Sequence, residues 1–310
     1  MNKELLYNIS AMPYRQPIPV YGWRFGGPQR TLAVMGAIRG DEYQQMYIAA
    51  RLIHRLEKLE ASGALSEDAG ILVIPCAAQF SLNVSRRFWP LDNTDINRMF
   101  PGYEDGETTQ RLAHKIFHAL QGYHWGIHLT SLYLPGDFVP HIRVMKTGWQ
   151  KEEEGLDFGL PYLIIRSPRP YDTVTLNYNW QVWETHAFSL YTKENSDIDP
   201  VSAEMAVDSI LRFLASHGLL QAELPPGQTT VPCDESHMAT FYSTQAGLLF
   251  PQKYPGDKVV PGDVVARILD PCTTEVREEI KSSVSGEVFF LRSARLLPEH
   301  TIVCRIIPGT

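Results

Sequence analysis

Apolar and polar residues follow two alternating patterns over the first two-thirds of the chain. Short, almost continuous apolar runs are typical of strands buried within a sheet, and they occur at 30–38, 69–77, 123–131, 161–167 and 185–195. Longer stretches with apolar residues at helical spacing occur at 42–63, 108–122 and 199–220. Strands that alternate with helices predict an α/β fold, with a mostly parallel or mixed sheet and helices on both faces.

The pattern changes after Leu220. Residues 221–230, "QAELPPGQTT", have the Pro- and Gly-rich composition of a linker. Beyond them, short apolar runs are separated by turn signals without a helical period, which indicates a small β-barrel or sandwich. We therefore expect two domains, an α/β domain at 1–222 and a small all-β domain at 223–310.

Composition and charge narrow the classes of partner. The 310 residues have a formal net charge of -7, and no cluster of Lys and Arg follows a predicted helix, which argues against a nucleic-acid surface. No stretch approaches the roughly 20 apolar residues of a membrane span, and the N-terminus lacks the apolar segment of a signal peptide. The four cysteines lie far apart, as expected of reduced thiols. These features predict a cytoplasmic protein without nucleic-acid or membrane partners, and they are compatible with a homo-oligomer.

Two polar turns follow predicted strands. "GAIRGDE", residues 36–42, ends in Glu42, which is suited to be a metal ligand or a general base. Arg39 stands three residues earlier, where a zinc site made from one short loop is expected to have a histidine. "GIHLTS", residues 126–131, places His128 at the end of a short strand, the edge where open α/β sheets bind ligands. A lone buried histidine is more often a hydrogen-bonded core residue.

Two further segments carry charged or amide side chains. The first contains Arg87, Asn97 and Arg98, and the planar fork of arginine is suited to a carboxylate. Its alternative interpretation is a solvated loop with local ion pairs. The second, "LYTKENS", contains Glu194 at the end of a predicted strand, where it is placed to be a general base or is simply an exposed charge.

Taken in order, these segments resemble the succinylglutamate desuccinylase/aspartoacylase family, which is related to the zinc carboxypeptidases. "GAIRGDE" resembles its Gly-x-His-Gly-x-Glu loop, and "TDINRMFPG" resembles its Asp-Leu-Asn-Arg-x-Phe-Pro-Gly segment. "GIHLTS" is similar to its Asp-Leu-His-Thr segment, and "LYTKEN" is similar to its Thr-x-Glu-x-Gly strand. The C-terminal part resembles the small β-domain that many members carry, so that the resemblance extends over nearly the whole chain.

The resemblance implies zinc-assisted hydrolysis of an amide bond in a small anionic N-acyl amino acid or similar substrate. It makes Glu42 and His128 ligands of one zinc ion. It makes Glu194 the general base that takes a proton from zinc-bound water and returns it to the leaving amine. The residues that it assigns to binding of the substrate are Arg87, Asn97 and Arg98.

The chain departs from the family pattern at the metal site. Arg39 replaces the first zinc-binding histidine, and a protonated guanidinium has no lone pair for a metal ion. Gly126 replaces the aspartate that precedes the second histidine, Asn195 replaces the glycine after the base, and "CAAQF" replaces an Asn-Pro turn. Three alternatives stay open: a zinc-dependent hydrolase, a metal-free pseudoenzyme that binds an acidic amino-acid-like ligand with Arg39 in the metal's place, and a protein that acts through its C-terminal domain or in an assembly. The working prediction is the hydrolase.

Overall fold

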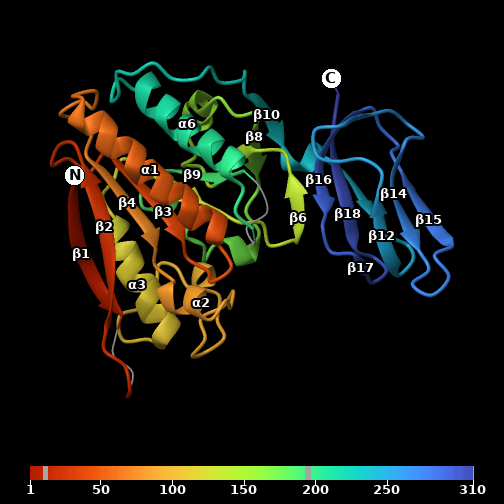
Figure 1. The fold of residues 1–310 in the computed structure, drawn as a ribbon, viewed down its shortest axis with the longest axis horizontal. Coiled ribbons are helices and arrows are strands. Elements are labelled where there is room, and N and C mark those ends of the chain that lie inside the picture. Colours follow the sequence, from red (N-terminus) through yellow and green to blue (C-terminus); the bar gives the residue numbers. More distant parts are fainter. Residues whose placement is uncertain (10–12, 193–196, 310) are drawn as a thin grey trace. The chain divides into compact units, whose positions relative to one another are not determined.

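The central sheet combines parallel and antiparallel strands (Figure 1). The computed structural model describes residues 1–9, 13–192 and 197–309. Contacts within the chain divide these residues into two units. The first unit contains 1–9, 13–131, 141–191 and 197–232, and the second contains 132–140, 192 and 233–309. Among the described residues, no helix is both long and apolar enough to cross a membrane.

Nine of the described strands form the large sheet, in the order β1-β2-β4-β3-β5-β9-β7-β8-β10. Their bounds are β1 Asn2–Ile9, β2 Ile18–Phe25, β3 Leu32–Ala37, β4 Ile71–Cys76, β5 Trp125–Leu129, β7 His141–Met145, β8 Tyr162–Arg166, β9 His186–Tyr191 and β10 Val231–Asp234. The four central strands β4, β3, β5 and β9 are mutually parallel. Antiparallel pairing joins β1 to β2, β2 to β4 and β9 to β7. The carboxyl ends of β4, β3, β5 and β9 therefore meet at one edge of the sheet.

Helices cover both faces of this sheet. Helices α1, Tyr43–Ala61, and α6, Pro200–Ser216, pack with Val34 and Val73 in one apolar cluster. Helix α3, Thr108–Leu120, and helix α5, Leu176–Val182, pack with Ala33 and Leu72 in another. Because successive strand residues point to opposite faces, the two clusters are the two sides of the sheet. The short helices are α2 Gln79–Asn83 and α4 Glu152–Gly155, and the described 3-10 turns are Ile96–Arg98, Leu156–Phe158, Pro170–Asp172 and Glu235–His237.

The strands and helices predicted from the hydrophobic pattern are confirmed in type and order, and so is the α/β fold class. The pattern did not predict the hairpin of β1 and β2, which extends the sheet in the antiparallel sense. It also missed α5, a short helix with little apolar periodicity that supplies two residues to the site described below. The predicted strand 185–195 is described as a strand only as far as Tyr191.

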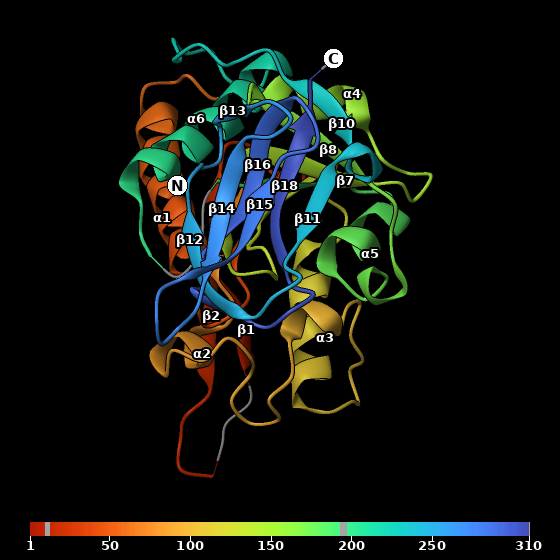
Figure 2. The same cartoon turned by 90° about the vertical axis from the view of Figure 1, so that its right-hand side faces the viewer.

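The second unit has two antiparallel sheets, whose strands face the viewer in Figure 2. It has its own apolar core. One sheet has the order β11-β18-β16-β13, with β6 also paired to β16, and the other has the order β15-β14-β12-β17. The bounds are β6 Gly136–Phe138, β11 Ala239–Tyr242, β12 Gly247–Pro251, β13 Lys258–Val259, β14 Val264–Leu269, β15 Val276–Lys281, β16 Gly286–Arg292, β17 Leu296–Leu297 and β18 Ile302–Pro308. Strand β6 lies about a hundred residues before β11, the next strand of this unit, and Phe138 pairs with Phe290.

Candidate functional site

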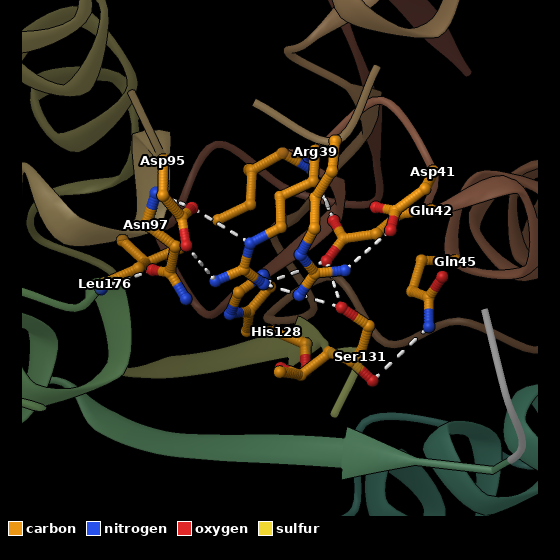
Figure 3. A network of polar contacts seen from close by, with 12 residues as sticks. Arg39, Asp41, Glu42, Gln45, Asp95, Asn97, His128, Ser131 and Leu176 are labelled. Atoms are coloured by element: carbon orange, nitrogen blue, oxygen red, sulfur yellow. Dashed lines mark hydrogen bonds and ion pairs between the residues drawn. The ribbon is translucent and has the colours of Figure 1, made fainter. Parts of the chain in front are cut away.

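Polar side chains from three segments meet at the carboxyl edge of the central parallel strands (Figure 3). Arg39 and Glu42 lie in the turn after β3, Asp95 and Asn97 lie in the segment after β4, and His128 lies near the end of β5. Because these strands are parallel neighbours, the three positions lie at the same edge of the sheet.

The turn after β3 needs glycine at position 40. The amide of Gly40 donates to the carbonyl oxygen of Arg87 at 3.2 Å. A Cβ atom at Gly40 would lie 2.1 Å from the carbonyl oxygen of Arg86 and 2.4 Å from the carbonyl carbon of Ser81. The loop after β4 thus packs directly on this turn, and the contact fixes the positions of Arg39 and Glu42 relative to that loop.

The guanidinium of Arg39 lies between two carboxylates, as Figure 3 shows. Its Nε and Nη2 donate to the two oxygens of Asp95 at 2.9 and 3.0 Å, and its Nη1 donates to Oε1 of Glu42 at 3.0 Å. The Arg39 side chain is only 3% exposed. Two-point pairing of this kind uses the planar fork of arginine, so that Arg39 is held in one orientation.

All acceptor positions of Glu42 are occupied. Its Oε2 accepts the backbone N–H groups of Ile38 and Arg39 at 2.9 and 3.1 Å. Its Oε1 accepts the hydroxyl of Ser131 at 2.6 Å in addition to Arg39 Nη1. The side chain is fully buried. A carboxylate has about four acceptor sites, so four donors satisfy Glu42 completely.

The guanidinium of Arg39 and the carboxylate of Asp95 stay charged. Burial acts to lower the pKa of Arg39, but the charges of Glu42 and Asp95 raise it above its ordinary value. Burial acts to raise the pKa of Asp95, but the charge and hydrogen bonds of Arg39 bring it below its ordinary value. The buried guanidinium between the buried Glu42 and the partly buried Asp95 offsets part of the cost of removing these charges from water.

His128 is buried and neutral. Burial, followed by the charge of Arg39, lowers the pKa of His128 to about 3. Its Nδ1 lies 3.0 Å from Oδ1 of Asn177, and its Nε2 has no hydrogen-bond partner among the described residues. With the amide oriented in this way, Nδ1–H donates to Asn177, and Nε2 carries the lone pair.

Trp180 occupies the space beside Gly126. A Cβ atom at Gly126 would lie 2.8 Å from the Trp180 ring, which is fully buried. Helix α5 therefore contributes both this ring and Asn177, the amide that holds His128. The position where the family pattern has an aspartate cannot accept one unless the indole moves. An amide thus supports the His128 ring in this protein.

The residues that the resemblance assigns to substrate binding differ in their contacts. The side-chain oxygen of Asn97 accepts the N–H of Leu176 at 2.9 Å and so ties its turn to the start of α5. The Arg87 guanidinium pairs with Asp41 at 2.7 Å. Arg98 makes no ion pair with a described carboxylate. It donates to its neighbour's backbone oxygen at 3.0 Å, and burial, then the charge of Arg39, lowers its pKa.

The sequence did not indicate Arg143, on β7. Its Nη2 donates to the hydroxyl of Tyr191, and its guanidinium lies 4.5 Å from the centre of that ring. No described carboxylate pairs with Arg143, and its charge is among the lesser causes that lower the pKa of His128. An arginine within an otherwise buried strand was the signal for it in the sequence.

The described side chains around Arg39 do not fit a zinc ion. Catalytic zinc sites use three protein ligands with available lone pairs. Glu42 has none left, Arg39 offers none, and a fixed cation between the carboxylates repels Zn²⁺. Within the described ranges, the group of three His, Cys, Asp or Glu ligand atoms found close together lies elsewhere, at His124, Glu154 and His186. Glu194 lies outside the described residues.

Comparison with known proteins finds a related catalytic domain in one segment of the chain. Residues 28–130, which include Arg39, Glu42, Asn97 and His128, match the model of the succinylglutamate desuccinylase/aspartoacylase catalytic domain. This segment of the chain is therefore similar to the catalytic domain of that family. Its fold is that of a succinylglutamate desuccinylase/aspartoacylase from Rhodobacter sphaeroides, with a TM-score of 0.80 and 17% identity over 98% of this chain and 95% of the other.

Two further relatives carry more specific names. An N-alpha-acetyl-L-2,4-diaminobutyric acid deacetylase from Halomonas elongata is 24% identical over 256 residues, which are 79% of this chain and 72% of the relative. The product-bound ectoine utilization protein of Ruegeria pomeroyi has a TM-score of 0.77 and 19% identity, over 95% of this chain and 90% of the other. The family thus includes deacylases of small N-acyl amino acids.

Proposed function

We propose that this protein binds a small anionic ligand of the N-acyl amino acid type without a metal ion, and that Arg39 stands in the metal's place. The observation that carries the proposal is the pairing of Arg39 with both Asp95 and Glu42 in a buried position. It leaves Glu42 without a free acceptor site and puts a permanent charge where the family pattern has a zinc-binding histidine.

The charge balance of the site favours an anion. Arg39, Arg98 and Arg143 outnumber the carboxylates of Glu42 and Asp95 by one, because Arg87 and Asp41 cancel each other and His128 is neutral. Arg98 and Arg143 are half-buried and have no carboxylate partner among the described residues. A partly desolvated guanidinium gains most from a carboxylate that arrives with the ligand.

His128 supplies the complementary contact for an amide. Its unpartnered Nε2 is a buried acceptor, which the N–H of an acylated amine satisfies. A ligand with a carboxylate and a secondary amide can pair its carboxylate with Arg98 or Arg143 and donate its amide N–H to Nε2 of His128. N-acetylated and N-succinylated acidic amino acids have this combination.

The second candidate is the zinc-dependent deacylase, and the named deacetylase relative favours it. In that function His128 and Glu42 bind the ion and Glu194 is the general base. Zinc must then displace Arg39 from two buried carboxylates, and breaking such pairs costs about 3–5 kcal/mol. The same cost lowers the affinity for zinc by roughly two to four orders of magnitude.

Calorimetry with N-acetyl-L-aspartate and N-succinyl-L-glutamate, in the presence of a chelator, tests the proposal. We expect binding that the chelator leaves unchanged and that Arg98→Gln weakens at least about tenfold, since a charge-assisted pair is worth about 1.5–3 kcal/mol. The matched control is Arg51→Gln, which removes an arginine from the outer surface of α1. Stoichiometric zinc that disappears in His128→Ala, together with ligand hydrolysis that disappears in Glu194→Ala, would establish the deacylase instead.

A further inference from the structure

Two histidines and a glutamate gather at the opposite edge of the sheet, where β5 and β9 begin. His124 immediately precedes β5, and His186 is the first residue of β9. The backbone N–H of His186 donates to the carbonyl oxygen of His124 at 2.9 Å, and the two ring centres lie 4.4 Å apart. Glu154, on α4, places its two oxygens 2.9 and 3.0 Å from Nδ1 of His186. All three residues belong to the first unit.

The spacing of these side chains suits a single ion. One ligand atom from each residue lies within 4.8 Å of the other two. Zinc bonds of about 2.0–2.1 Å in a tetrahedron separate neighbouring ligand atoms by about 3.3 Å. The contact between His186 and Glu154 is already near that separation, and the His124 ring can approach by rotating about its side-chain bonds.

The surroundings of the group resemble those of a bound metal in two respects. Trp125 Nε1 donates to Oε2 of Glu154 at 2.8 Å, which orients the carboxylate in the way that partners of metal ligands do. His124 is exposed, whereas His186 and Glu154 are half-buried. An ion can therefore enter from solvent and keep a water molecule at its fourth position.

We propose that His124, Glu154 and His186 form a binding site for a divalent transition-metal ion such as Zn²⁺, Ni²⁺ or Cu²⁺. Two imidazoles and one carboxylate are the ligands that these ions accept. The site is distinct from the one around Arg39, because β5 separates His124 from His128 by about 13 Å. The bound ion joins α4 to the beginnings of two central strands, and it stabilises the fold whether or not the Arg39 site binds a ligand.

Titration of the full chain with Zn²⁺, after treatment with a chelator and dialysis, tests this proposal by calorimetry and metal analysis. We expect one bound ion per chain. His186→Gln and His124→Gln should each lower the affinity at least about tenfold, and Trp125→Phe should lower it by about 10–100-fold through the loss of the contact with Glu154. Glu154→Gln is the variant of choice if either histidine variant fails to fold, because it keeps the shape of the side chain.

Three control variants separate this site from other histidines. His54→Gln removes an exposed histidine of α1, and His128→Gln alters the Arg39 site. His118→Gln breaks the stacked pair with His114 on α3, whose ring centres are 6.2 Å apart. All three should bind zinc as the unchanged chain does. The absence of uptake by the unchanged chain, or uptake that depends on His118 or His128 and not on His186, would overturn the proposal.

Discussion

Arg39 pairs with two carboxylates at once, so changing it should lower stability more than changing a surface arginine does. Asp95 and Glu42 both receive its donors, and neither has a second cation within ion-pair distance among the described residues. The loss in free energy of unfolding when Arg39 is changed is therefore set by the cost of leaving two carboxylates without a cation. It is not set by the strength of one ion pair.

We expect Arg39→Met to lower the free energy of unfolding by about 3–5 kcal/mol, because the methionine leaves Glu42 and Asp95 unpaired in a buried place. Urea denaturation in the presence of a chelator measures this loss. Arg51→Met is the control, since Arg51 and Glu204 are both more than a third exposed, and exposed pairs contribute about 0–1 kcal/mol. Equal losses in the two variants would contradict the role given to Arg39.

His128 gives the folded protein a dependence on pH. Its pKa is about 3 in the folded chain and near 6.5 when it is solvated, so the unfolded chain holds more protons between these values. Stability should fall as the pH drops from 6.5 towards 3, by up to about 1.4 kcal/mol per pH unit from this group. Urea denaturation between pH 5 and 7 should show a shallower slope for His128→Gln, and identical slopes would refute the prediction.

At the scale of elements, β5 and α5 are adapted to each other. The missing side chain at Gly126 makes room for the Trp180 ring, and the same helix holds His128 through Asn177. The Trp180 ring thus fills the space that a side chain at position 126 would need. Replacing Arg39 by histidine would accordingly provide one metal ligand. His128 would still be held by the side-chain amide of Asn177 and not by a carboxylate.

We expect Gly126→Ala to lower the free energy of unfolding by about 1–3 kcal/mol, because the added methyl group overlaps the Trp180 ring. In a Trp180→Leu background the same change should cost less, since the smaller side chain leaves space. A double-mutant cycle from urea denaturation measures the difference. Additive effects of the two changes would show that Trp180 does not limit position 126.

The sequence predicted the elements whose periodicity is strong. Buried strands such as β3 and β4 are continuous apolar runs, and amphipathic helices such as α1 have apolar residues at helical spacing. Both patterns can be recognised in the sequence. The pairing of Arg39 with Asp95 could not be predicted from the sequence, because the two residues are 56 positions apart and only the tertiary fold brings them together. For the same reason the sequence did not indicate Arg143 or Asn177. The roles of Glu42, His128, Asn97, Arg98, Arg87 and Glu194 remain proposals.

At the scale of the whole molecule, the second unit is not continuous in sequence. Strand β6 pairs with β16 through Phe138 and Phe290, and the N–H of Val139 donates to the carbonyl oxygen of Phe289 at 2.9 Å. The division at residue 222, which was predicted from the change in composition, assigned this strand to the first domain. A C-terminal fragment cut near that point lacks one of its strands, and the edge of β16 is left open.

We expect a fragment of residues 223–310 to be less stable and more prone to aggregate than the same fragment with residues 132–140 joined through a Gly/Ser linker. Each kcal/mol of unfolding free energy that residues 132–140 restore should raise the melting temperature by about 4–8 °C in a domain of this size. Circular dichroism and light scattering measure the two effects. Scrambling the order of residues 132–140 provides the control, and equal behaviour of the two fusions would show that β6 is dispensable.

The positive charge at the centre of the Arg39 site belongs to an amino-acid side chain and is therefore part of the protein as it is synthesised. A bound ion must be acquired from the cell's supply, can be lost to a stronger competitor, and can be exchanged for the wrong element. The guanidinium of Arg39 is present once in each chain from the moment of synthesis, and its two-point pairing with Asp95 fixes its direction. A protein built in this way keeps the same charge at that point through starvation for zinc and through excess of copper or nickel.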